Sequence, residues 1–123
     1  MNWLAVATGG AIGACFRYAF ALMCAPLGVR FPLATFLANS IGCFLMGLGF
    51  VLIVERGLLN DVWRHLLLIG LLGAFTTFST FSIESLSLLR DELYKTAALY
   101  VGASVIVSLL SASIGMFVAK NFL

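Results

Sequence analysis

Residues 70–81 read Gly-Leu-Leu-Gly-Ala-Phe-Thr-Thr-Phe-Ser-Thr-Phe and lie in the middle of an apolar run long enough to cross a bilayer. Glycine, threonine and serine weaken a helix, whereas the bilayer core demands one because it offers no water to backbone N–H and C=O groups. Such a segment is tolerated only where neighbouring groups, an ion or a water-lined cavity satisfy the freed backbone. We therefore interpret residues 70–81 as a site at membrane depth, with a break in the helix that carries it.

The composition places this segment in a bundle of membrane-spanning helices. Of the 123 residues, 63% are hydrophobic and 10% are charged, which is too apolar for one small water-soluble core. Four stretches approach the roughly 20 residues that a bilayer core of about 30 Å requires: they cover residues 3–25, 33–54, 66–89 and 97–118. The connectors are too short for a soluble domain, so we expect one all-α transmembrane domain of four helices over residues 1–123.

The sequence gives no basis for enzymatic chemistry. It contains no Walker loop, no catalytic carboxylate pair and no Ser/His/Asp set that could meet. Cys15, Cys24 and Cys43 lack metal-ligand spacing, and their odd number argues against a disulfide framework. We interpret these three cysteines as small packing residues.

Basic residues are balanced between the two ends of the predicted spans. Four spans put both termini and the loop 55–65 on one side of the membrane, and the loops 26–32 and 90–96 on the other. Each side then holds three basic residues: Arg56, Arg64 and Lys120 on the first, and Arg30, Arg90 and Lys95 on the second. The positive-inside rule has no difference to act on, so we expect insertion in both orientations and a closed antiparallel homodimer. The alternative is that one loop dominates and fixes a single orientation.

A two-fold axis in the membrane plane would bring the weak segments of two copies together. At about 1.5 Å of rise per residue, Gly73 to Thr80 lie roughly 10 to 21 Å into the membrane, near its midplane. The two segments would pool backbone carbonyl oxygens, which are hard ligands suited to a small cation. The alternative is a packing face of small residues, with Gly70 and Ala74 or Gly73 and Thr77 as its contacts.

Two rows of side chains suit an anion. One row is aromatic and recurs every three residues as a single stripe, formed by Phe75, Phe78 and Phe81. The positive edges of such rings can stabilise an anion without trapping it, although aromatic stripes also pack or face lipid. The other row bears hydroxyl groups at helical spacing in the fourth span, where it equally suits close helix packing: it comprises Tyr100, Ser104, Ser108 and Ser111.

Three polar side chains inside the spans need partners. Asn39 lies near the depth of Phe81, with Thr35 one turn earlier, and its amide N–H₂ could bind an anion in a narrow path. Arg17 and Glu84 both lie roughly 20 to 27 Å deep. They either form an ion pair or mark a vestibule in which Arg17 draws anions toward the hydroxyl row.

Three motifs resemble those of the small fluoride channels called Fluc or CrcB. Residues 9–18, GGAIGACFRY, resemble the family's GGxxGAxxRY start, residues 39–42 its Asn-x-x-Gly motif, and residues 76–81, TTFSTF, its third-helix signature. The motifs follow the family's order and spacing over nearly the whole chain. One position departs from the pattern, because Ala74 stands where the family often has a second glycine. Alanine leaves the backbone carbonyls in place and bears only on the flexibility of the break.

The resemblance implies a passive, fluoride-selective channel of the inner or plasma membrane that exports cytoplasmic fluoride and so reduces its toxicity. It implies an antiparallel, dual-topology homodimer with two pores and a structural sodium ion, held by backbone carbonyls of Gly73 and Thr76. Arg17 and Glu84 would form the vestibule or an ion pair. The implied partners are fluoride, a second copy and the lipid bilayer, with no nucleic acid. The implied fluoride pathway consists of Asn39, Phe78, Ser79, Thr80, Phe81, Tyr100, Ser104 and Ser108.

Two other classes of protein compete with this interpretation. A small multidrug-resistance-type transporter also has four spans and dual topology, but it needs a titratable carboxylate in the first helix, where this chain has Arg17 and no acid. A non-transporting helical assembly factor would explain the small-residue faces. It would not explain a weak segment at the midplane combined with Asn39 and a hydroxyl row.

Overall fold

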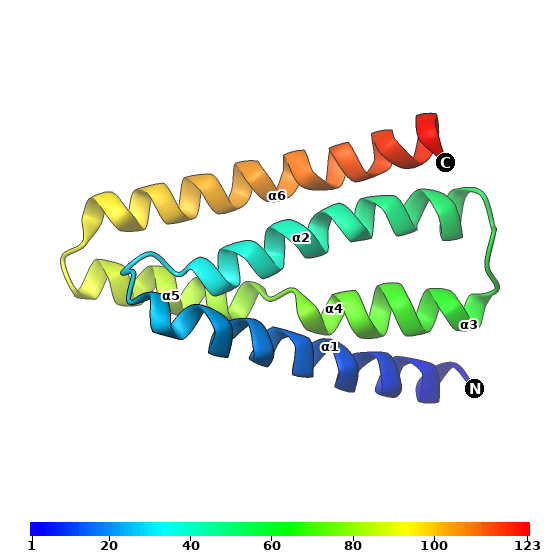
Figure 1. Ribbon diagram of the computed structural model, residues 1–123, viewed down its shortest axis with the longest axis horizontal. Coiled ribbons are helices and arrows are strands. Elements are labelled where there is room, and N and C mark those ends of the chain that lie inside the picture. Colours follow the sequence, from blue (N-terminus) through cyan, green and yellow to red (C-terminus); the bar gives the residue numbers. More distant parts are fainter.

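Four rods of helix, each long and apolar enough to cross a membrane, make up the computed structural model, which describes residues 1–123 (Figure 1). The first rod is α1 (Asn2–Cys24) with the 3-10 turn η1 (Ala25–Leu27), and the second is α2 (Leu33–Gly49) continued by the π-helical η2 (Phe50–Glu55). The third rod is divided into α3 (Asp61–Trp63), the π-helical η3 (Arg64–Leu72), α4 (Gly73–Phe75) and α5 (Phe78–Arg90). The fourth is α6 (Tyr94–Phe122).

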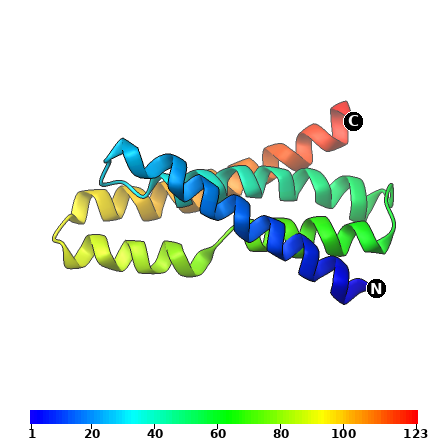
Figure 2. The same cartoon turned by 60° about the horizontal axis from the view of Figure 1, so that its bottom comes forward.

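Rods that follow one another in the sequence run in opposite directions, so each packed pair, the first rod with the third and the second with the fourth, is parallel. Both termini lie at the same end as the loop 56–60, and the loops 28–32 and 91–93 lie at the other end (Figure 1). The rod of α2 packs along α6, whereas α1 packs on η3 and α4 and crosses the third rod obliquely (Figure 2). The loops turn sharply at Gly28 and Gly57, whose φ angles of 60° and 62° lie in the left-handed region that favours glycine.

Glycines let the backbones of paired rods touch. A Cβ atom at Gly9 or Gly13 of α1 would overlap a backbone carbonyl oxygen of η3, from Leu66 or Leu71 respectively. In the other pair, a Cβ atom at Gly115 of α6 would overlap the carbonyl oxygen of Phe44 in α2. Small residues are the usual means of close helix packing in lipid, where hydrophobic association between helices is weak.

The third rod is interrupted at Thr76 and Thr77. Thr76 has φ −79° and ψ 155°, and Thr77 has φ −153° and ψ 126°, so both residues are extended. Figure 2 shows this pair as a thin link between the two helical parts of the rod. Helix resumes at Phe78, with Thr77 as the N-cap residue: its Oγ1 accepts the backbone N–H of Thr80 at 3.2 Å. The extended pair falls inside the segment 70–81 that the sequence marks as weak helix.

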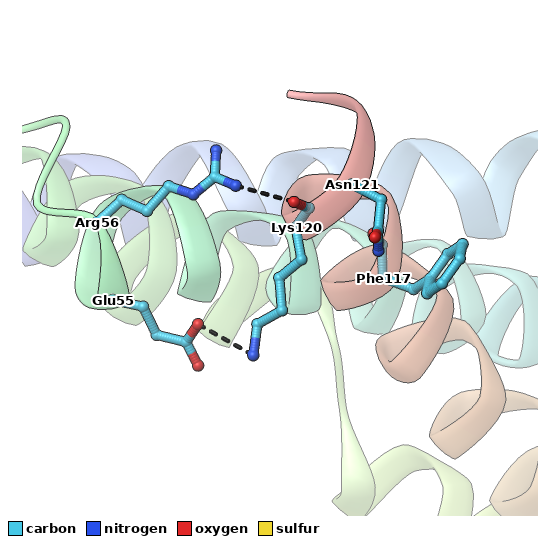
Figure 3. A network of polar contacts seen from close by, with 5 residues as sticks. All are labelled: Glu55, Arg56, Phe117, Lys120 and Asn121. Carbon is cyan, nitrogen blue, oxygen red and sulfur yellow. Dashed lines mark hydrogen bonds and ion pairs between the residues drawn. The ribbon is translucent and has the colours of Figure 1, made fainter.

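A polar network joins the second and fourth rods at the end that holds the termini (Figure 3). The ammonium group of Lys120 lies 3.2 Å from the carboxylate of Glu55, and the guanidinium of Arg56 donates to the Lys120 carbonyl oxygen at 3.1 Å. Both members of the ion pair are partly exposed, so we assign the pair at most about 1 kcal/mol of stability. The close contact of α2 with α6 therefore depends mainly on packing.

We predict that Gly115→Ala destabilises the protein by about 1–3 kcal/mol, because the added methyl group meets the backbone of Phe44, which cannot yield as a side chain would. The measurement is the melting temperature in detergent. Gly102→Ala is the matched control on the same helix, since nothing lies within 4 Å of its added Cβ atom. Equal melting temperatures for the two variants would contradict the observed packing of α2 on α6.

Candidate functional site

The side chain of Asn39 holds the extended segment from the second rod. Its Oδ1 accepts the backbone N–H of Thr77 at 2.7 Å, and its Nδ2 donates to the Thr77 carbonyl oxygen at 3.0 Å. One amide thus satisfies both backbone groups of a residue that the interruption removes from the helical pattern. A primary amide carries two N–H donors, so one donor of Asn39 is left for another partner.

Thr77 is the functional residue that sequence reasoning missed. It is buried, binds Asn39 through its backbone, and lies within hydrogen-bonding distance of Ser79 and Thr80 through its hydroxyl group. A threonine immediately before the first turn of a helix is a recognisable N-cap signal, and that signal would have located the start of α5.

The same hydrogen bonds free two backbone carbonyl oxygens. In a continuous helix the N–H of Thr77 would donate to Gly73 and that of Thr80 to Thr76, but here they donate to Asn39 and to the Thr77 hydroxyl. The Thr76 hydroxyl donates back to Leu72 at 2.8 Å. Gly73 and Thr76 both line one cavity, and backbone carbonyl oxygens are of the hard ligand type that small cations prefer. No cluster of three or more His, Cys, Asp or Glu side chains competes for a metal ion.

That cavity, of about 430 Å³, lies beside the interruption and carries no charged side chain in its lining. The rings of Phe78 and Phe81 meet there with centroids 5.4 Å apart and planes inclined at 44°. Opposite them, Ser104 is 6% exposed, and its hydroxyl oxygen has no hydrogen-bond partner. The lining comprises Asn39, Cys43, Gly73, Thr76, Thr77, Phe78, Phe81, Ser104, Val105, Ser108 and Leu109. Five of the eight predicted pathway residues therefore line this cavity: Asn39, Phe78, Phe81, Ser104 and Ser108.

A second cavity, of about 310 Å³, contains Arg17, Thr35, Thr80 and Glu84. The carboxylate of Glu84 accepts a hydrogen bond from the Thr35 hydroxyl at 2.9 Å and another from the Tyr100 hydroxyl at 2.7 Å. Arg17 and Glu84 line the same space but form no ion pair. Glu84 is satisfied by hydroxyl groups instead, which leaves the guanidinium of Arg17 without a carboxylate partner within the chain.

The interruption divides the predicted aromatic stripe. Phe75 ends α4, is buried, and packs edge-on against Phe20 of α1 with ring centroids 5.6 Å apart. Only Phe78 and Phe81, which follow the interruption, face the first cavity. The prediction of a single stripe is wrong because a spacing of three residues keeps side chains on one face only while the helix continues.

The predicted hydroxyl row is divided as well. Tyr100 is fully buried, its ring packs against Phe31 and Phe81, and its hydroxyl group is bound to Glu84 rather than facing the first cavity with Ser104 and Ser108. Ser79 is exposed and lines neither of these two cavities, while Thr80 lines the second. The predicted pathway residues thus belong to two adjacent spaces.

The two alternatives for the small residues apply to different positions. A Cβ atom at Gly70 would lie 2.8 Å from the Val6 carbonyl oxygen, so Gly70 is a packing contact with α1. At Gly73 the nearest such atom is 3.6 Å away and belongs to the same rod, so no neighbouring helix requires a glycine there. Packing against α1 thus explains the glycine at position 70, whereas Gly73 lines the 430 Å³ cavity.

Comparison with known proteins gives consistent matches over nearly the whole chain. The family model described as CrcB-like protein, Camphor Resistance (CrcB) matches residues 4–116. Proteins named fluoride-specific ion channel FluC are similar: that of Saccharophagus degradans is 46% identical over 97% of this chain and 90% of its own length. Those of Coxiella burnetii and Chloroflexus aurantiacus are 41% and 43% identical, with 98% of this chain covered in each case and 99% and 97% of the relatives. With four apolar spanning helices and relatives that are ion channels rather than enzymes, this chain belongs to the CrcB family of multi-pass membrane proteins.

Proposed function

We propose that this protein is a passive, fluoride-selective channel that exports cytoplasmic fluoride across the inner or plasma membrane. The observation that carries the proposal is the uncharged polar cavity beside Thr76 and Thr77, where an amide, two serine hydroxyls and two aromatic rings converge. Relatives 40–46% identical that are named fluoride-specific ion channels support the choice of ion. Hydrogen fluoride crosses membranes as a neutral acid and ionises inside, so an anion leak releases what would otherwise accumulate.

The cavity offers fluoride several weak donors in place of one strong cation. The Ser104 hydroxyl has no partner in the chain, and Asn39 has one N–H donor beyond the one bound to Thr77. The ring edges of Phe78 and Phe81 add a weaker positive potential. A small, tightly hydrated anion passes only where its water is replaced by contacts that do not hold it too strongly.

The two helix ends at the interruption have opposite polarity. The first turn of α5 presents backbone N–H groups and the positive end of the helix dipole toward the cavity that contains Phe78. The carbonyl end of α4 has the opposite sign. Interrupted membrane helices use these two ends for anions and cations respectively, and the proposal assigns them to fluoride and to sodium.

In the proposed assembly, two oppositely inserted copies form an antiparallel homodimer with an axis in the membrane plane. The supporting observation is the equal number of basic residues at the two ends of the bundle, which the positive-inside rule cannot rank. The axis would superpose the midplane segments of both copies. The vestibule of each pore is assigned to the second cavity, where the unpaired Arg17 attracts anions.

A structural sodium ion fits the backbone at this axis. Each copy supplies the carbonyl oxygens of Gly73 and Thr76, neither of which accepts the bond that a continuous helix would give it. When bound, sodium supplies positive charge that holds the carbonyl ends of the two α4 helices together.

The first prediction tests conduction with Asn39→Asp. In proteoliposomes with a fluoride electrode, we expect the native protein to release fluoride and the variant to be slower by roughly ten- to hundredfold, as for the loss of a hydrogen bond to an ion. A charged aspartate repels fluoride, and a protonated one uses its single O–H on the Thr77 carbonyl and has no donor left. Asn121→Asp, at the exposed end of α6, is the control. Rapid efflux through Asn39→Asp would remove Asn39 from the pathway.

The second prediction concerns the sodium ion. After long dialysis that replaces sodium with a bulky organic cation, the purified dimer should melt at a lower temperature, and added sodium should restore it. Thr76→Ser should respond as the native protein does, because the proposed ligand is the backbone oxygen. Identical melting curves in both salts would contradict a bound ion that stabilises the dimer.

The third prediction concerns topology. Lysines added near Asn121, with Arg30 and Lys95 neutralised, should fix the termini in the cytoplasm. Basic residues added at 26–32 and 90–96 should fix the opposite orientation when three residues on the other side are neutralised: Arg56, Arg64 and Lys120. Neither variant alone should protect fluoride-sensitive cells, whereas the two expressed together should. Full protection by one fixed-orientation variant would rule out the antiparallel dimer.

A further inference from the structure

The three free cysteines lie in different surroundings. Cys15 is exposed on the outer surface of α1, and Cys24 is half-buried at the end of that helix. Cys43 lies on α2 one turn after Asn39 and lines the 430 Å³ cavity. A packing role, which the sequence suggested for all three, leaves the position of Cys43 in this lining unexplained.

An independent observation indicates that this cavity holds a polar occupant. Ser104 lines the same space, and its buried hydroxyl oxygen has no partner in the chain. A buried hydroxyl without a hydrogen bond costs about 1–3 kcal/mol, so a water molecule or an anion in the cavity is needed to satisfy it. Cys43 lines this same space, so a small water-soluble reagent that enters the cavity meets its side chain.

We propose that Cys43 is a thiol modification site inside the cavity, open to small water-soluble electrophiles of the alkylthiosulfonate class, and that the adduct blocks anion passage. The blocking effect rests on the proposed channel function, whereas the reaction itself does not. The Cys43 thiolate, having released its proton to water, attacks the sulfenyl sulfur of the reagent. A disulfide bond to Cys43 forms, the bond between the two reagent sulfurs breaks, and the alkylsulfinate leaves with the electron pair.

The adduct would lie beside the groups proposed to contact fluoride. Asn39 and Cys43 are neighbours four residues apart on one helix face, roughly 5–6 Å between their Cβ atoms. A group attached to the sulfur therefore lies beside the amide donor proposed for fluoride and opposite Ser104 of α6. A sulfonate on that group also places a like charge next to the anion.

The experiment uses 2-sulfonatoethyl methanethiosulfonate, whose charge keeps it out of lipid, on proteoliposomes of the Cys15→Ala/Cys24→Ala variant. We expect intact-mass analysis to find one adduct, and fluoride efflux to fall about tenfold or more relative to the untreated sample. Dithiothreitol should remove the adduct and restore the rate. Cys43→Ala with the other two cysteines present is the matched control, and its efflux should not respond to the reagent.

Each outcome separates the two proposals. Absence of an adduct on Cys43 would overturn the modification site, and an adduct with unchanged efflux would overturn the block. If the untreated protein releases no fluoride, the channel function fails, while the mass measurement still decides whether Cys43 faces water.

Discussion

The need to satisfy every backbone polar group in lipid governs this structure. Thr76 and Thr77 leave the helical pattern inside a spanning rod. Without other partners, several backbone N–H and C=O groups would then be unpaired in hydrocarbon. Asn39 satisfies the backbone N–H and C=O groups of Thr77 with two hydrogen bonds. The cavity, the free carbonyls of Gly73 and Thr76, and the N-terminal end of α5 all exist because this exchange of partners is possible.

Close helix contact is the second condition, since Asn39 reaches Thr77 only if α2 stands near the third rod. Glycines of α2 allow this approach: an added Cβ atom would overlap the Thr76 side chain at Gly42 and would lie 2.6 Å from the Leu68 side chain at Gly49. Two cavities remain among the hydroxyl-bearing and aromatic side chains between the rods. Packing and polar satisfaction thus act at different positions of the same rods.

Local properties of the sequence predicted the features that depend on them, namely the four spanning helices and the weak helical segment in the third. Apolar length located the four rods, and helix-weakening residues located the segment that contains Thr76 and Thr77. Register across the interruption was out of reach, because two extended residues rotate everything that follows, which is why Phe75 is separated from Phe78 and Phe81. The partners of Glu84 could not be predicted from the sequence either. Periodicity along one helix cannot show that hydroxyl groups from two other rods, rather than Arg17, bind this carboxylate.

The bond from Asn39 to Thr77 also sets an order of events during synthesis. A third span that enters the membrane alone would carry an unsatisfied backbone at Thr77, but the second span precedes it in the chain and supplies the amide. The extended segment at Thr76 and Thr77 is therefore completed by a residue of an earlier span, rather than by a residue that follows it. An exchange of the order of these two spans, with every native contact preserved in the final fold, would remove that advantage and leave the nascent segment to aggregate or to straighten into ordinary helix.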